Sequence, residues 1–421
     1  MHVLVLGAGL AGVTSAWYLK HAGFDVSVVD RQPGPAMETS FANGGQISVS
    51  HPEPWANPGA PGTILRWLGN DAAPLRVTPR ADWHQWLWAA RFLRECLPWR
   101  TRRNTAAIAA LARYSRECLQ ALRGATELDY THARRGILHL FFDAAEVARI
   151  PARVAELAAY AIAAEACDTA RCLAIEPALA HMARPPLGGI YAPDDEAGDA
   201  KEFIDALTLR LKAEGVRFHF ETRVDALDHQ GGLIEGVRVT RPDGSSARLD
   251  ASSYVLCMGS YSPLLVAPLG ERLPIYPVKG YSVSVPIVAP ARAPLVSLTD
   301  EARRIVCSRL GNTLRVAGTA ELNGYDLSPD PRREAAMLAW VDTHFAGATD
   351  LDAAEAWCGL RPTTPSNRPL IGKSGLLNLY YNTGHGTLGW TLACGSAAAL
   401  ADLMSGRRPR PDFPFLDSRF G

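Results

Sequence analysis

The stretch that decides the fold is Val3-Leu-Val-Leu6, followed by Gly7-Ala-Gly9-Leu-Ala-Gly12 and, after a helical segment, by Val26-Ser-Val-Val-Asp30. A short apolar run that ends in a glycine cluster is typical of a buried parallel strand turning into a helix. Gly7 permits the tight turn, Gly9 lets a pyrophosphate approach the backbone, and Gly12 lets the helix pack closely on the strand. The N-terminus of this helix then faces the phosphates. The first thirty residues therefore predict a dinucleotide-binding unit.

An acidic residue closes the second of these strands. Asp30 follows the glycines by about twenty residues, the distance at which a carboxylate accepts hydrogen bonds from the adenosine ribose hydroxyls. A glycine turn in another kind of α/β protein is the alternative interpretation, but it leaves the acid at this distance unexplained. NAD, NADP and FAD present the same pyrophosphate, so this motif leaves the identity of the dinucleotide open.

Length and composition narrow the class of protein. The 421 residues suffice for two domains with their own cores. The 43 Lys and Arg residues balance 43 Asp and Glu residues, which argues against a nucleic-acid-binding protein. Eight cysteines are scattered without CxxC pairs, as expected of reduced thiols rather than of disulfides or a metal site.

We expect a cytoplasmic location for this chain. The first predicted strand starts so early that no room is left for a signal peptide. No apolar run approaches the roughly twenty residues that a membrane span requires.

A second glycine-rich turn lies near the other end of the chain. A predicted strand at 377–381 leads into Asn382-Thr-Gly384-His-Gly386-Thr-Leu-Gly389, which opens a helix that runs to Gly406. An NAD site does not need such a turn. A flavin benefits from it, because the positive end of a helix stabilises the negative charge that collects at N1 and O2 of the reduced ring. The turn therefore favours FAD over a nicotinamide cofactor.

The middle of the chain alternates between two kinds of structure. An amphipathic helix at 199–214 and a strand at 216–220 return the chain to a doubly wound sheet. Alternating apolar and polar residues from Tyr276 to Pro286 and from Ile305 to Gly318 predict antiparallel strands, and a helix at 331–345 follows them. We therefore predict an α/β protein with a second sheet of antiparallel strands.

Five segments together carry a resemblance to a known family, namely the first thirty residues, residues 38–48, the strand at 254–262, the turn Pro277-Val-Lys279-Gly-Tyr281 and the stretch 357–391. With these segments the chain resembles the FAD-dependent D-amino acid dehydrogenases of the D-amino-acid oxidase superfamily, almost end to end. The resemblance implies a discontinuous, Rossmann-like FAD-binding domain and an α+β substrate domain built on an antiparallel sheet. The expected ranges are 1–50, 145–272 and 355–421 for the FAD-binding domain, and 51–144 and 273–354 for the substrate domain.

The same resemblance implies the reaction. D-amino acids would be oxidatively deaminated to 2-oxo acids and ammonia by hydride transfer from Cα to flavin N5, with the electrons passed to a quinone or another acceptor that is not oxygen. The preference for D over L substrates comes from the resemblance alone. Related enzymes that act on D-hydroxyproline, glycine or sarcosine share these motifs and remain alternatives, as does a flavin-binding scaffold without activity.

Hydride transfer depends more on alignment of the substrate than on a strong base. The main requirement is therefore a carboxylate clamp, that is, a side chain that binds the substrate carboxylate in a fixed orientation. Arg361 is our candidate, because a guanidinium holds a carboxylate through two hydrogen bonds and this arginine matches the carboxylate-binding one of related oxidases. Tyr276, Tyr281 and His385 are further candidates for lining the pocket. Arg303 and Arg304 lie where relatives often place a tyrosine over the substrate.

The residues expected to bind FAD come from both glycine-rich turns and from the segments between them. They are Gly7, Gly9, Leu10, Ala11, Gly12, Asp30, Arg31, Ser40, Asn43, Gly44, Gly45, Gln46, Ile47, Val224, Met258, Gly259, Gly384, Gly386, Thr387, Leu388 and Gly389. A covalent thioether through Cys358 is a minor alternative to non-covalent binding.

A tryptophan-rich helical pattern at 82–98 has two interpretations. Its aromatic residues alternate with arginines, and such a surface lies well on an anionic membrane, as a quinone-linked enzyme would need on the cytoplasmic face of the inner membrane. Packing of the helix on its own domain explains the same residues. Both interpretations stay open at the level of sequence.

Overall fold

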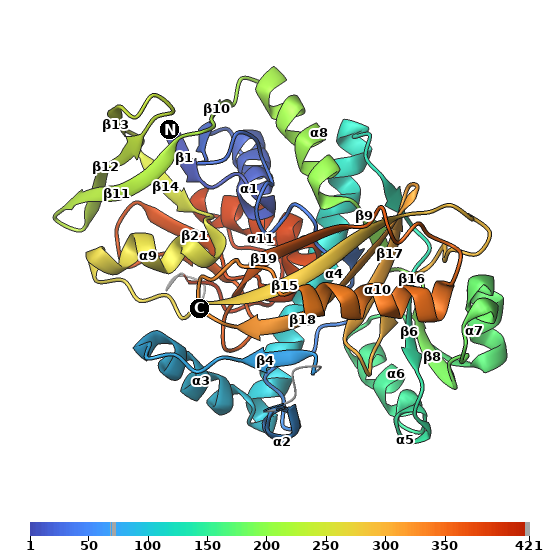
Figure 1. The fold of residues 1–421 in the computed structure, drawn as a ribbon. Coiled ribbons are helices and arrows are strands. Elements are labelled where there is room, and N and C mark those ends of the chain that lie inside the picture. Colours follow the sequence, from blue (N-terminus) through green and yellow to red (C-terminus); the bar gives the residue numbers. More distant parts are fainter. Residues whose placement is uncertain (68, 70–72, 417–421) are drawn as a thin grey trace.

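The computed structural model describes residues 1–67, 69 and 73–416, which form two large and two small sheets with helices around them (Figure 1). The first sheet has six strands in the order β10 (Arg217–His219), β2 (Asp25–Val29), β1 (His2–Leu6), β14 (Ser253–Leu256), β21 (Leu379–Thr383) and β20 (Leu370–Lys373). The first five are parallel, and β20 pairs with β21 in the antiparallel sense. This is the doubly wound sheet that the glycine motif predicts.

Both faces of this sheet are buried, as the continuous apolar run in β1 requires. Val3 and Val5 belong to a core shared with helices α1 (Leu10–His21), α4 (Pro98–Thr126), α8 (Ala200–Ala213) and α11 (Gly389–Met404). Leu4 and Leu6 face the opposite core, which the three-stranded antiparallel sheet of β11 (Arg223–Gln230), β12 (Leu233–Thr240) and β13 (Ser246–Leu249) covers together with α9 (Ser262–Val266). Alternate residues of one strand thus supply two cores.

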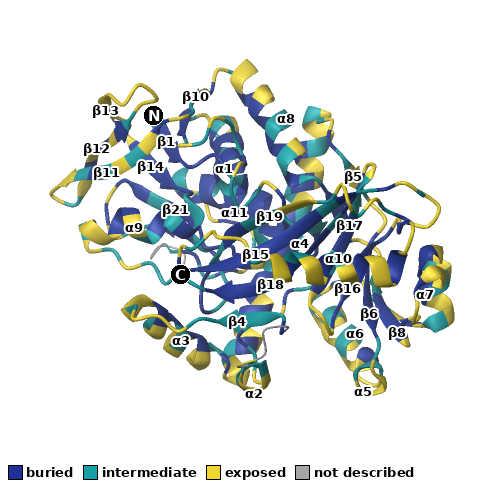
Figure 2. Cartoon of the chain, viewed as in Figure 1, coloured by how far each residue is buried: buried dark blue, intermediate teal, exposed yellow. Residues whose placement is uncertain are grey.

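The second sheet has nine strands and is mostly antiparallel. Its order is β19 (Glu355–Thr363), β15 (Tyr276–Pro286), β18 (Thr313–Leu322), β17 (Ile305–Leu310), β16 (Ser297–Asp300), β6 (Ile137–Phe141), β8 (Gly188–Ala192) and β7 (Glu165–Asp168), and β4 (Leu75–Val77) pairs with β18. Helix α10 (Pro331–Phe345) packs on one face, where the strands are dark blue in Figure 2 because they are buried. The predicted strand at 276–286 and the predicted helix at 331–345 are confirmed.

The remaining elements border the nine-stranded sheet. Helices α5 (Ala144–Val147), α6 (Ile150–Ala159) and α7 (Thr169–Ile175) lie near β6, β7 and β8, while α2 (Ala60–Trp67) and α3 (Trp83–Glu95) lie near β4 and β15. A small sheet of β3 (Gln46–Ile47), β9 (Glu196–Gly198) and β5 (His132–Ala133) joins distant segments. Short 3₁₀ turns are η1 (Pro177–His181), η2 (Gly259–Tyr261), η3 (Ala267–Leu269) and η4 (Gly386–Leu388).

The predicted domain ranges differ from the observed strand pairing. Strands β7 and β8 fall in the range 145–272 and β19 in the range 355–421, both assigned to the FAD-binding domain, yet all three pair in the nine-stranded sheet. Helix α4 falls in the range 51–144 of the predicted substrate domain but packs on α11 in the core of the first sheet. The cause is that a local pattern predicts a strand or helix without identifying its distant partner.

The contact between α4 and α11 depends on a glycine. A Cβ added at Gly395 would lie 2.7 Å from the Cα of Ser115, so the two helices approach too closely for a side chain there. Gly124, also in α4, has nothing within 4 Å of such a Cβ.

These two glycines therefore make a matched pair. Gly395→Ala is expected to destabilise the protein by about 1–3 kcal/mol through overpacking. Gly124→Ala is expected to stabilise it by about 0.5–1 kcal/mol, because alanine loses less backbone entropy in a helix. Thermal melting of the FAD-loaded protein measures both, and Tm shifts of the same sign and size would contradict the close approach.

Candidate active site

A cavity of about 1000 Å³ is lined by residues of both sheets and by both glycine-rich turns. The sequence prediction that two turns from opposite ends of the chain meet at one site agrees with this geometry. Of the residues expected to bind FAD, those that line the cavity are Gly7, Gly9, Leu10, Ala11, Asp30, Arg31, Ser40, Asn43, Gly44, Gly45, Gln46, Val224, Met258, Gly259, Gly384, Gly386, Thr387, Leu388 and Gly389. Gly12 and Ile47 lie behind this surface.

The first turn has the geometry that a pyrophosphate requires. Gly7 has a φ of +106°, and a Cβ there would lie 2.7 Å from the carbonyl oxygen of Cys257. A Cβ at Gly12 would lie 1.8 Å from the carbonyl oxygen of Gly7, so Gly12 acts through helix packing rather than through ligand contact. Gly9 is the N-cap of α1 and has no side chain to compete for the helix N–H groups. The turn therefore leaves a helix N-terminus open to an anion.

Asp30 lies at the cavity surface at the end of β2. Its carboxylate accepts hydrogen bonds from the N–H groups of Ala8, at 2.6 Å, and Gln32, at 2.8 Å. Burial raises the pKa of Asp30, and these two backbone hydrogen bonds oppose the rise. The carboxylate is thus fixed beside the glycine turn, where the ribose of a dinucleotide would meet it.

The segment 39–46 crosses the nine-stranded sheet and is held there by side-chain hydrogen bonds. The donors and acceptors are Thr39 Oγ1 to Leu360 O at 2.8 Å, Ser282 Oγ to Ala42 O at 2.6 Å, Ser308 Oγ to Gly44 O at 2.8 Å, and Gln46 Nε2 to Thr299 Oγ1 at 3.1 Å. A Cβ at Gly44 would lie 2.5 Å from Cγ2 of Val306, so this segment needs glycine to lie flat on the sheet. One face of it therefore packs on the sheet while residues along it line the cavity.

The second turn reaches the same cavity from β21. Gly384 and Gly386 have φ values of +81° and +56°, and η4 leads directly into α11. His385 is buried between them, and its Nε2 lies 2.9 Å from Ser396 Oγ. Burial lowers the pKa of His385 to about 4, so its imidazole is neutral at physiological pH. Both this turn and the first turn fit a cofactor with a pyrophosphate and a ring that becomes negatively charged on reduction.

Arg361 lies on β19 and lines the cavity. Its guanidinium lies over Gly280 of β15, where a Cβ would be only 2.2 Å from Cζ, and Nη1 donates to the carbonyl oxygen of Thr319 at 2.9 Å. No salt bridge joins Arg361 to a carboxylate within the described ranges. Burial lowers its pKa to about 10. An enclosed cation with free donors and no counter-ion is the complement of a substrate carboxylate.

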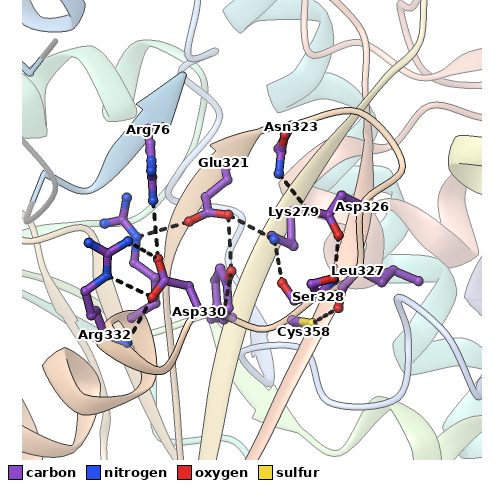
Figure 3. Close-up of polar contacts among 12 residues, drawn as sticks. Arg76, Lys279, Glu321, Asn323, Asp326, Leu327, Ser328, Asp330, Arg332 and Cys358 are labelled. Atoms are coloured by element: carbon purple, nitrogen blue, oxygen red, sulfur yellow. Dashed lines mark hydrogen bonds and ion pairs between the residues drawn. The ribbon is translucent and has the colours of Figure 1, made fainter. Parts of the chain in front are cut away.

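Tyr281 is among the residues that line the cavity, as the sequence prediction expects, but its hydroxyl is bound to other residues. The Tyr281 hydroxyl donates to Glu321 at 3.1 Å and accepts from the Asp330 N–H at 3.2 Å. Glu321 belongs to a buried ionic cluster that also contains Lys279, at 3.0 Å (Figure 3). Tyr281 follows Gly280 directly, and neighbouring residues of a strand point to opposite faces, so its ring packs under α10.

Tyr276 lies on the same face of β15 as Gly280 but four residues earlier, about 13 Å along the strand. Its ring lies 6.0 Å from that of Trp88 in α3, and it is not among the residues that line the cavity. Its role is packing beneath α3. Of these three candidates, Tyr281 and His385 line the cavity and Tyr276 does not.

Several residues that line the cavity are not predicted from the sequence. Gly280 makes the space for Arg361, and a glycine inside a strand is a signal of such a close approach. Trp357 lies on the same side of β19 as Arg361, since it packs over Gly359 two residues away from each. Ser50, His51, His139 and Glu301 line a more distant part of the wall. Only the structure brings these four residues together, because Ser50-His51, His139 and Glu301 come from three separate segments.

Comparison with known proteins agrees with the geometry. The family model described as FAD dependent oxidoreductase matches residues 2–403, so the chain belongs to this family. Its fold is shared by solved structures of glycine oxidase from Bacillus cereus (TM-score 0.72, 21% identity, 96% of this chain and 95% of that one) and of L-proline dehydrogenase from P. horikoshii (TM-score 0.71, 16% identity, 96% and 94%).

Curated relatives indicate a narrower group of enzymes within this family. The chain is 51% identical to a D-amino acid dehydrogenase of Dechloromonas aromatica strain RCB, over 99% of this chain and 100% of the relative. It is 47% identical to a D-amino acid dehydrogenase of Rhizorhabdus wittichii, over 97% of both chains. The family resemblance predicted from the sequence motifs is confirmed, and with it FAD as the cofactor.

Gly280 offers a test of the Arg361 site that leaves the arginine in place. Gly280→Ala adds a methyl group where the guanidinium now lies, so the side chain must move while the strand keeps its hydrogen bonds. We expect normal FAD content and a rise of at least about tenfold in KM for the amino acid, which corresponds to about 1.4 kcal/mol. Gly62→Ala, with nothing within 4 Å of its Cβ, is the control. Unchanged kinetics in Gly280→Ala would remove Arg361 from the substrate site.

Proposed function

We propose that this flavoenzyme oxidatively deaminates D-amino acids to 2-oxo acids and ammonia, with Arg361 as the group that binds the substrate carboxylate. The observation that carries the proposal is the enclosed guanidinium of Arg361, which lines the cavity that both glycine-rich turns border. The relatives named D-amino acid dehydrogenase support the choice of substrate class.

Arg361 does most of the positioning. Thr319 O accepts one guanidinium N–H, and Gly280 supports the flat side of the group, so other N–H groups remain for both oxygens of a carboxylate. A carboxylate held by two parallel hydrogen bonds has a fixed orientation, and its Cα then has a fixed direction as well. FAD, when bound, accepts the hydride that leaves Cα.

The second glycine-rich turn borders the other side of the cavity. The N-terminus of α11 and the N–H groups around Gly386 give this region positive potential. His385 stays neutral and holds Ser396 within the helix, so it supports the turn rather than taking part in proton transfer. The substrate amine therefore either binds in its unprotonated form or loses its proton to a group other than His385.

Replacement of Arg361 tests the proposal. Anaerobic addition of D-alanine to the FAD-loaded protein is expected to bleach the flavin absorbance, and L-alanine is expected to leave it unchanged. Arg361→Ala should keep FAD and lose about 2–5 kcal/mol of transition-state binding, a fall in kcat/KM of roughly 30- to 5000-fold. Arg361→Lys should recover little, because an ammonium lacks the forked geometry.

Arg210→Ala removes an exposed arginine of α8 and serves as the control for loss of charge. If Arg361→Ala bleaches at the wild-type rate, Arg361 does not bind the substrate. If the wild-type protein bleaches with L-alanine and not with D-alanine, the stereochemical part of the proposal is wrong.

We also propose that the electrons pass to a membrane quinone and that α3 rests on an anionic membrane surface. Trp88 and Phe92 of α3 pack against the body of the protein, so the two interpretations of this helix are not exclusive. Its other face leaves Trp83 72%, Trp86 53% and Leu93 54% exposed. Basic residues flank this face, and Figure 2 shows the outer side of α3 as exposed. Among the described residues, no helix is long and apolar enough to cross a bilayer.

Vesicle binding tests this placement. The protein is expected to sediment with vesicles that contain phosphatidylglycerol and to reduce a soluble quinone analogue under anaerobic conditions. Trp83→Ala/Trp86→Ala should reduce the bound fraction at least about tenfold through loss of apolar contact and leave soluble turnover unchanged. Leu209→Ala, on exposed α8, is the control. Equal sedimentation of the double variant and the wild type would exclude α3 as the contact.

A further inference from the structure

A polar cluster on the cavity wall plays no part in the proposed reaction. It consists of His139 on β6, His51 in the loop after β3, and Glu301 in the turn between β16 and β17. His139 lies three strands from β18, whose Thr319 O holds Arg361, so roughly 14 Å of sheet separates the two. The cluster therefore faces the same cavity at a distance from the carboxylate clamp.

Hydrogen bonds fix Ser50 beside the ring of His139. Ser50 Oγ lies 2.5 Å from Asp195 Oδ2, and the N–H groups of Val49, at 2.9 Å, and Ser50, at 3.3 Å, also donate to this carboxyl group. Ser50 Oγ is therefore held at one position next to His139.

Both ring nitrogens of His139 face oxygen atoms. Nε2 lies 3.0 Å from Ser50 Oγ, and Nδ1 lies 2.9 Å from Glu301 Oε1. With the ring proton on Nε2, the lone pair of Nδ1 faces the Glu301 carboxyl group, and a cation between the two atoms is bound by both.

His51 adds a third ligand atom to this pair. Its ring is stacked on that of His139, with centroids 5.9 Å apart and planes 8° from parallel. His51 Nδ1 lies 3.9 Å from Glu301 Oε1, and one ligand atom from each of the three residues lies within 4.8 Å of the others.

We propose that His51, His139 and Glu301 bind one divalent transition-metal ion of the Zn²⁺ type, with a fourth coordination position that opens into the cavity. Two imidazole nitrogens and one carboxylate oxygen form a ligand set typical of zinc sites with an open position. Ligand distances of about 2.0–2.2 Å require the three atoms to come within roughly 3–4 Å of one another. A small movement of the loop that carries His51 achieves this.

The second layer of the cluster has the arrangement that metal sites use. A ligating histidine normally donates its other ring N–H to an oxygen that is itself fixed. His139 Nε2 is placed to do so, because it lies 3.0 Å from Ser50 Oγ, which in turn contacts Asp195. This chain fixes the ring and increases the basicity of Nδ1. Arg304 Nη1 donates to Glu301 Oε2 at 2.9 Å and leaves Oε1 for the metal.

Metal binding can be measured without substrate or turnover, so its result is independent of the proposed function. FAD-loaded, tag-free protein is treated with EDTA, desalted and titrated with ZnCl₂ by calorimetry. Zinc X-ray absorption then reports the ligands. We expect one ion per chain, with imidazole scattering in the spectrum, and loss of at least about tenfold in affinity in His51→Gln and Glu301→Gln.

His229→Gln, which removes an exposed histidine of β11, is the matched control and should bind as the wild type does. FAD content and Tm show whether each variant is folded, and His51 lies in a loop with 38% of its side chain exposed, so its replacement is tolerated best. Absence of a stoichiometric ion in the wild type, or equal zinc affinity in wild type and His51→Gln, would overturn the proposal.

Discussion

Among the described residues, no carboxylate pairs with the positive charge of Arg361 on the cavity wall. Within that part of the chain its one hydrogen bond runs from Nη1 to Thr319 O, and its pKa falls because of burial. Such a cation destabilises the protein by itself, since transfer of an unpaired charge from water costs several kcal/mol. The surrounding structure tolerates this cost because β15, β18 and β19 are held by long antiparallel pairings. In the proposed reaction, binding of the substrate carboxylate removes part of this cost, so the instability of the free site would contribute to substrate affinity.

The two glycine-rich turns show why part of this site can be predicted from sequence. A glycine with a positive φ or a forbidden Cβ is a local requirement, and Gly7, Gly384 and Gly386 satisfy it at the positions where the motifs place them. The helix dipoles follow from the same local pattern, because α1 and α11 begin directly after the turns. Arg361 is predictable for a chemical reason, since few residue types can hold a carboxylate at two points.

Other features depend on contacts between distant parts of the chain. Tyr281 is a residue type that is common in binding pockets. Side chains of β15 point alternately to its two faces, and this turns the Tyr281 hydroxyl toward Glu321 and Asp330. Strands β7 and β8 follow helical segments, and only their pairing with β6 shows that they belong to the second sheet. His139 and Glu301 are separated by 162 residues, so no spacing rule could join them. Sequence patterns therefore predict turns and charged anchors well and predict partners of strands poorly.

The segment 39–46 has a consequence for how the protein exchanges ligands. It connects to the first sheet through β2, yet its hydrogen bonds attach it to β19, β15, β17 and β16 of the second sheet. A hinge motion between the sheets would have to break these hydrogen bonds and separate segment 39–46, which lines the cavity, from the second sheet. Exchange of substrate and product is therefore expected to depend on the motion of individual side chains and loops at the cavity rather than on separation of the two sheets.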